Sequence, residues 1–115
     1  MEPSIKTWLA DIEIAISEIY SFLPNRTDFE AFRDDIKTKR AIERNLEIIG
    51  EAMGRILKVE PDFPITTARQ IIDTRNRIIH GYDDVSDQII WTIVVLYLKG
   101  LQSEIQVIKE SGHWK

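Results

Sequence analysis

The stretch AIERNLEIIGEAMGRIL, residues 41–57, decides the fold of this chain. Its apolar side chains recur at spacings of three and four residues, which is typical of one buried stripe along an α-helix. The stripe is made by Ile42, Leu46, Ile49, Met53, Ile56 and Leu57. A helix with one apolar face is stable in water only when other elements cover that face. We therefore expect a long helix that ends before Pro61 and packs against further amphipathic helices.

The segments on either side show the same periodicity. Apolar residues from Ile5 to Phe22 predict a helix from about Pro3 to Phe22 that stops near Pro24. Asp28 and the following FEAFRDDI predict a short helical stretch between the two long helices.

The second half of the chain predicts two more helices. After Pro61 and Pro64, Thr66 or Thr67 can cap a third helix that runs to His80. A fourth helix begins at Ser86 or Asp87 and contains IIWTIVVLYL, residues 89–98.

Apolar residues surround most of this fourth helix, whereas a helix on the outside of a small monomer needs only one apolar stripe. Either it is the central helix of the bundle or, as we favour, it also forms a homodimer interface. The pattern as a whole predicts an all-α fold, an antiparallel bundle of four to five helices, with residues 1–115 as a single domain in a homodimer.

Composition excludes several classes of protein. Hydrophobic residues make up 43% and charged residues 30%, so the chain can form a core. Without cysteine it has no disulfide and no thiolate nucleophile, and two histidines are few for a metal centre. The longest apolar run is about half the ~20 residues of a membrane-spanning helix. We expect a cytoplasmic protein without a membrane segment.

Two glycines lie one turn apart on the long helix of residues 41–57. Gly50 and Gly54 each cost about 1 kcal/mol of helix propensity relative to alanine. We expect both to allow close packing against another helix.

The third helix combines an apolar stripe with charged and polar side chains. Arg75 falls on the apolar side. The other side carries Asp73, Asn76, Arg77 and His80. An unpaired buried charge costs several kcal/mol, so Arg75 either extends its guanidinium out to solvent or is paired in a desolvated site. In the structural interpretation its partner is a carboxylate such as Glu47 or Glu51, and the pair locks two helices.

His80 has two interpretations of its own. A histidine at a helix C-terminus can cap the last carbonyl groups, or it can act in catalysis. Arg75 and His80 are about 140° apart around a regular helix, so one straight helix cannot aim both at a single atom. A two-fold axis beside this helix would bring the same residues of two protomers into one cleft.

The sequence RNRIIHGY, residues 75–82, resembles a known motif. Its order of Arg, four residues, His, one residue and Tyr is similar to the R-x4-H-x-Y motif of the HEPN superfamily, in the branch of HepT-type toxins. The segments ERNLEIIGEA, residues 43–52, and IIW, residues 89–91, also resemble that branch, so the likeness covers roughly residues 38–108. Many relatives carry Trp where this chain has Ile65.

The resemblance implies an all-helical dimer that cleaves RNA without a metal or another cofactor, at a cleft between protomers. It implies Arg75 and His80 as the catalytic residues. Supporting or substrate-binding roles fall on Asn76, Arg77, Tyr82, Arg44 and Asn45.

It also implies a protein partner. HepT-like toxins are encoded beside a minimal nucleotidyltransferase antitoxin, which transfers AMP to the motif tyrosine, here Tyr82, in a complex that can be larger than the dimer. The added bulk and negative charge would block RNA.

Two alternatives remain. The cleft could bind a nucleotide or RNA without catalysis, in a module that serves a nucleotidyltransferase. Arg75 could also be purely structural, in a helical dimer without activity.

The net charge of −4 argues against binding nucleic acid through bulk positive charge. The charge is uneven, however, because residues 39–58 and 66–82 each carry a net +2. If both segments face one cleft in a dimer, they predict a small focused site for RNA.

Overall fold

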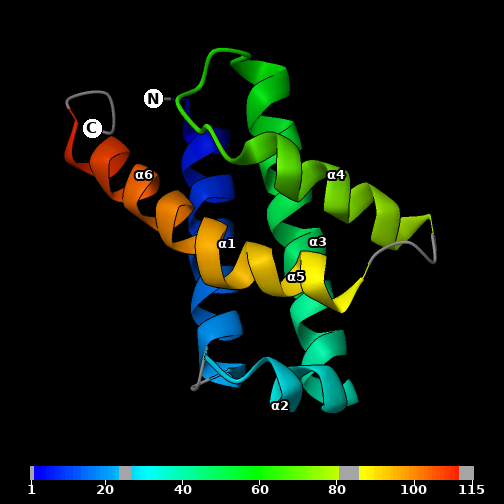
Figure 1. Ribbon diagram of the computed structural model, residues 1–115. Coiled ribbons are helices and arrows are strands. Elements are labelled where there is room, and N and C mark those ends of the chain that lie inside the picture. The colour runs from blue at the N-terminus through cyan, green and yellow to red at the C-terminus, as the bar shows by residue number, and fades with distance from the viewer. Residues whose placement is uncertain (1, 24–26, 81–85, 112–115) are drawn as a thin grey trace.

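The computed structural model describes residues 2–23, 27–80 and 86–111, and the regular structure in these ranges is helical throughout. Figure 1 shows two layers of helices. Helices α1 (Pro3–Phe22) and α3 (Ile36–Val59) run antiparallel and form one layer, joined by the short helix α2 (Phe29–Asp34). The other layer contains α4 (Ala68–Ile79) and a longer rod made of α5 (Asp87–Thr92), the π-helix η1 (Ile93–Tyr97) and α6 (Leu98–Glu110).

Local sequence explains where several helices begin. Asp28 precedes α2 and accepts a hydrogen bond from the backbone N–H of Ala31. Asp35 does the same for Thr38 at the start of α3, and Ser86 for Ile89 at the start of α5. These side chains satisfy N–H groups that have no partner within the helix.

The core is one cluster between the two layers, to which every helix contributes. Its fully buried members include Ile5, Leu9, Ile12, Ile16, Ile19, Phe32, Ile42, Leu46, Ile49, Met53, Ile56, Ile71, Leu98, Leu101 and Ile105. An aromatic group attaches the rod to α2, because the Trp91 ring packs 5.2 Å from Phe32 and 5.7 Å from Phe29, measured between ring centroids. Burial of this apolar surface supplies most of the stability of the fold.

Polar contacts place the rod across the other layer. Lys39 of α3 contacts Asp87 at 3.2 Å, with both side chains largely buried, and fixes the start of α5 against α3. Near the other end of the rod, Lys109 of α6 contacts Glu13 of α1 at 3.3 Å. The rod therefore crosses α3 with one end and α1 with the other (Figure 1).

Several expectations about these helices are confirmed and others are wrong. The helical bundle, the short α2 and the start of the fourth helix at Ser86 are confirmed. The fourth helix is not one regular α-helix, because η1 interrupts it. Thr67 does precede α4, but it makes no side-chain capping bond. The backbone N–H and hydroxyl of Thr66 bind Glu104 instead.

Gly50 and Gly54 of α3 differ in how closely another helix packs on them. A Cβ at Gly50 would lie 2.6 Å from the Cβ of Arg75, so the expected close helix packing is confirmed there. At Gly54 the same expectation is wrong, because no atom of another helix lies within 4 Å of such a Cβ among the described residues. Ile65, like Phe63, is buried in the core.

The apolar rod is only partly covered by this chain. Ile90, Ile93, Val94 and Leu98 are buried, whereas Leu96 is 65% exposed. Leu96 is thus left uncovered in one chain, and the expected homodimer interface on this helix stays a prediction. Within the described ranges, no helix combines the length and apolar character needed to cross a bilayer.

Candidate functional site

Helix α4 positions Arg75 by packing closely on α3. The aliphatic part of Arg75 lies over Gly50, where a Cβ would meet Arg75 Cβ at 2.6 Å, Arg75 Cγ at 3.0 Å and the carbonyl oxygen of Ile71 at 3.2 Å. A larger residue at position 50 would push α4 away or turn Arg75 aside. The notch at Gly50 therefore fixes where the Arg75 side chain leaves the helix.

The guanidinium of Arg75 makes no ion pair within the described part of the chain. Its Nη1 donates to Oδ1 of Asn76 at 3.0 Å, and its buried Nε has no hydrogen-bond acceptor. The carboxylates that could have neutralised it bind other cations, since Glu47 contacts Arg44 at 3.6 Å and Glu51 contacts Arg55 at 2.6 Å. The prediction that Arg75 pairs with Glu47 or Glu51 is therefore wrong.

His80 stands at the exposed C-terminal end of α4. Its backbone N–H donates to the carbonyl oxygen of Asn76 at 3.0 Å, the regular bond of an α-helix, and His80 is the C-cap residue of α4. Asn76 thus contacts Arg75 through its side chain and His80 through its backbone. Tyr82, the third residue of the motif, lies outside the described residues.

Arg44 and Asn45, the two residues of α3 expected to support substrate binding, occupy different environments. Arg44 is 74% exposed and pairs with Glu47. Asn45 is only 4% exposed, and its side-chain Nδ2 donates to the carbonyl oxygen of Ala41 at 3.0 Å while its Oδ1 has no partner. The structure brings Arg75 and Asn76 together, but it gives neither Arg44 nor Asn45 a polar contact with α4. Their roles in substrate binding stay predictions.

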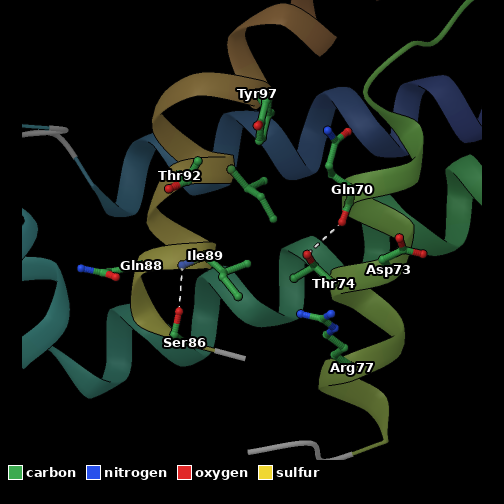
Figure 2. A pocket seen from close by; sticks show the side chains of 10 residues that line it. Gln70, Asp73, Thr74, Arg77, Ser86, Gln88, Ile89, Thr92 and Tyr97 are labelled. Carbon is green, nitrogen blue, oxygen red and sulfur yellow. Dashed lines mark hydrogen bonds between the residues drawn. The ribbon is translucent and has the colours of Figure 1, made fainter. Parts of the chain in front are cut away.

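Arg77 lines a groove that the sequence did not predict. The groove lies between α4 and the α5–η1 part of the rod and has a volume of about 500 Å³. In Figure 2, Gln70, Thr74 and Arg77 follow one another along its α4 side, and the Arg77 guanidinium is directed into it. Ile89, Ile93 and Tyr97 line the facing side.

The sequence contains a signal for the α4 side of this groove but none for the position of Tyr97. Gln70, Thr74 and Arg77 are spaced by four and three residues, so they form a polar stripe on α4 that could have been noticed. The position of Tyr97 depends on the π-helix η1, and no residue pattern predicts that interruption. Within the described residues, no group of three or more His, Cys, Asp or Glu side chains could hold a metal ion.

Comparisons with known proteins show the family to which the sequence is similar. The sequence model of a protein family described as "Ribonuclease HepT-like" matches residues 12–108. The match includes α3, α4 and most of the rod, and therefore the whole region around Arg75 and the groove.

Named relatives show the same likeness over nearly the whole chain. A "Probable ribonuclease HepT" of Thermococcus cleftensis is 32% identical over 114 residues, which cover 96% of this chain and 100% of the relative. A "Putative RNase" of Methanocaldococcus jannaschii is 32% identical over 105 residues, covering 90% of this chain and 86% of the relative. A "Putative RNase" of Caldanaerobacter subterraneus is 32% identical over 81 residues, covering 70% and 72%. No solved structure matches the chain.

Proposed function

Because the chain belongs to the ribonuclease HepT-like family, we propose that it is a metal-independent endoribonuclease in which Arg75 and His80 act on RNA. Family membership supports a ribonuclease, and one structural observation supports this assignment of residues. Arg75 is held in a fixed notch over Gly50, yet no carboxylate neutralises it among the described residues. A positioned cation without a counter-charge is suited to bind an anionic group such as an RNA phosphate.

The reaction that fits these residues is an intramolecular transesterification, in which the phosphate is transferred from the departing 5′-oxygen to the neighbouring 2′-oxygen. A base removes the proton of the 2′-hydroxyl, the 2′-oxygen attacks the neighbouring phosphorus, and an acid protonates the departing 5′-oxygen. Imidazole can take up or release a proton near neutral pH, so His80 can act in either role. Arg75 would hold the phosphate and stabilise the charge that develops on its oxygens.

We place this chemistry at a cleft between two protomers. Arg75 and His80 leave α4 in different directions, the first against α3 and the second at the exposed helix end. A symmetric dimer would supply a second histidine, so that one copy acts as base and the other as acid. We propose that the rod, where the apolar side chain of Leu96 is exposed, takes part in that contact.

Replacing Arg75 with methionine tests the assignment. Arg75→Met keeps the aliphatic stem over Gly50 and removes the charge, so we expect cleavage of single-stranded RNA in EDTA to fall at least about 100-fold. Arg69→Met is the matched control, because Arg69 is an exposed arginine of the same helix. This variant is expected to cleave RNA at the wild-type rate.

Equal activity of Arg75→Met and the wild type would contradict the assignment. Nucleotide binding that depends on Arg75, without any product from RNA, would instead favour the non-catalytic module.

We also propose that the protein is the toxin of a toxin–antitoxin pair and that a minimal nucleotidyltransferase neutralises it. In that step the phenolic oxygen of Tyr82 attacks the α-phosphorus of ATP, pyrophosphate leaves, and AMP remains on the tyrosine. Tyr82 is two residues from His80, so an adenylate there would add bulk and negative charge beside the proposed phosphate site.

Mass spectrometry tests this modification. Incubation with the cognate nucleotidyltransferase and ATP is expected to add one AMP to the wild type and to Tyr20→Phe, and none to Tyr82→Phe. AMP found on another residue would show that Tyr82 is not the acceptor. The modified wild-type protein is expected to lose RNA cleavage.

A further inference from the structure

From the groove between α4 and the rod we infer a second binding element for RNA, a subsite that takes one unpaired base next to the cleaved phosphate. The inference rests on the ribonuclease proposed above, and it deepens that proposal by adding recognition of single-stranded RNA. The base would stack on Tyr97, with its edge toward Gln70.

The size and lining of the groove match a nucleotide. Its volume of about 500 Å³ is sufficient for a base with its sugar and phosphate. Seven of its ten lining residues are polar or charged, and they surround two isoleucines and one aromatic ring, Tyr97. The core of a protein–protein contact is depleted in charged groups and more apolar than this. A small ligand with one flat apolar part and several polar groups fits better.

The arrangement along the groove gives the ligand a direction. In Figure 2, Tyr97 and Gln70 lie at one end, and Arg77 and Ser86 lie toward the other. Gln70 and Arg77 are separated by about 10 Å along α4, because each residue of an α-helix adds 1.5 Å. His80 follows Arg77 by one turn at the end of the same helix. The groove therefore leads from an aromatic end toward Arg77 and the helix end that carries His80, as a nucleotide leads from base to phosphate.

The π-helix η1 explains why Tyr97 reaches the groove. Ile89, Ile93 and Tyr97 line it at successive spacings of four residues. In a regular α-helix each such step turns about 40° beyond a full turn, so the third side chain would drift away from the first. A π-helix turns less per residue because its hydrogen bonds span five residues. The segment Ile93–Tyr97 thus keeps the ring aligned with Ile89 and Ile93.

The opposite wall can read the base. The Gln70 side chain is exposed and carries both a donor and an acceptor, which together match N7 and the N6 amino group of adenine. The adjacent Thr74 is only 4% exposed, and its hydroxyl donates to the Gln70 backbone carbonyl at 2.8 Å, which leaves its oxygen able to accept a further bond. We therefore expect a preference for adenine over uracil.

Binding of an uncleavable RNA separates the subsite from catalysis. A fluorescent 2′-O-methyl oligoadenylate lacks the attacking hydroxyl, and its affinity can be measured by fluorescence anisotropy. Tyr97→Leu removes the ring and should weaken binding about tenfold, whereas Tyr97→Phe keeps the ring and should stay within about twofold.

Gln70→Ala provides a second variant at an exposed position, where no folding defect is expected. It should abolish the preference for oligoadenylate over oligouridylate. Gln102→Ala, at an exposed glutamine of α6, should retain that preference. Circular dichroism of each variant checks that the helices are intact.

Each contrary result has a distinct meaning. Binding that depends on Tyr97, without cleavage of ordinary RNA by the wild type, would support the subsite and refute the ribonuclease. Cleavage by the wild type together with unchanged binding in Tyr97→Leu would refute the subsite alone. If Tyr97→Leu instead changes the sedimenting mass, the groove is a contact between two copies of the chain, and the inference is wrong.

Discussion

At the scale of single residues, the contact between Gly50 and Arg75 connects the sequence to the proposed chemistry. A guanidinium on an apolar stripe is costly unless it has a partner or a function. Here the stem of Arg75 fills the notch at Gly50, one nitrogen donates to Asn76, and Nε is left without an acceptor. The sequence predicted that Arg75 was unusual and that Gly50 allowed close packing. It did not predict that the two features belong to one contact.

Alanine substitutions at the two glycines of α3 test that contact. Gly50→Ala places a methyl group 2.6 Å from Arg75 Cβ, an atom close to the backbone that cannot swing away cheaply. We expect a loss of about 1–3 kcal/mol in unfolding free energy, measured by urea denaturation, and slower RNA cleavage because Arg75 is displaced.

Gly54→Ala is the control for this experiment. It meets no atom within 4 Å and lies one turn farther along the same helix, so it should gain about 0.5–1 kcal/mol from helix propensity. Equal effects of the two substitutions would contradict the close contact at Gly50.

Other residues show why partners are harder to predict than positions. Glu47 and Glu51 were both candidates for Arg75, but each binds an arginine of its own helix. Which carboxylate pairs with which arginine depends on side-chain geometry after the helices have packed, and a single sequence does not show that geometry. Tyr97 escaped prediction for the same reason, since its place at the groove requires η1.

At the scale of helices, periodicity predicted the elements well and their ends less well. The apolar stripes gave α1 and α3, and the caps at Asp28 and Ser86 behave as expected. Thr67 illustrates the limit, because a residue of good capping type precedes α4 without making the capping bond. Capping needs a specific side-chain rotamer, which tertiary contacts can override.

The cap of α3 gives a prediction about pH. Hydrogen bonds from the Thr38 side chain and backbone lower the pKa of Asp35 below its usual value. A carboxylate whose pKa is lowered by folding contributes stability that is fully present above its unfolded pKa of about 3.9 and is lost as the pH falls through the folded pKa. Asp35→Asn can still cap the helix, but its side chain does not titrate in this range.

Thermal melts of wild type and Asp35→Asn should therefore differ by a constant amount above about pH 5 and converge at lower pH. A difference that stays constant down to pH 3, or that grows, would show that the Asp35 carboxylate does not stabilise α3 in this way.

At the scale of the whole molecule, two features bear on the proposed cleft between protomers: the shape of the chain and the pairing of its cations. The principal extents are 43 × 29 × 19 Å, and the shortest matches two layers of helices, so the described residues form no third layer that would cover Leu96. Three arginines of α3, Arg40, Arg44 and Arg55, are each paired to a glutamate of the same helix. Arg75 of α4, by contrast, makes no ion pair among the described residues, so its charge is available to attract an RNA phosphate.

The central claim is that this chain cleaves RNA through His80, and cleavage by His80→Ala tests it most directly. We predict that the substitution lowers cleavage of single-stranded RNA in EDTA at least about 100-fold. His113→Ala, which replaces the only other histidine, should cleave like the wild type. Helical content should be unchanged, and sedimentation should still give the mass of two chains. RNA cleavage by folded His80→Ala at the wild-type rate would contradict the account.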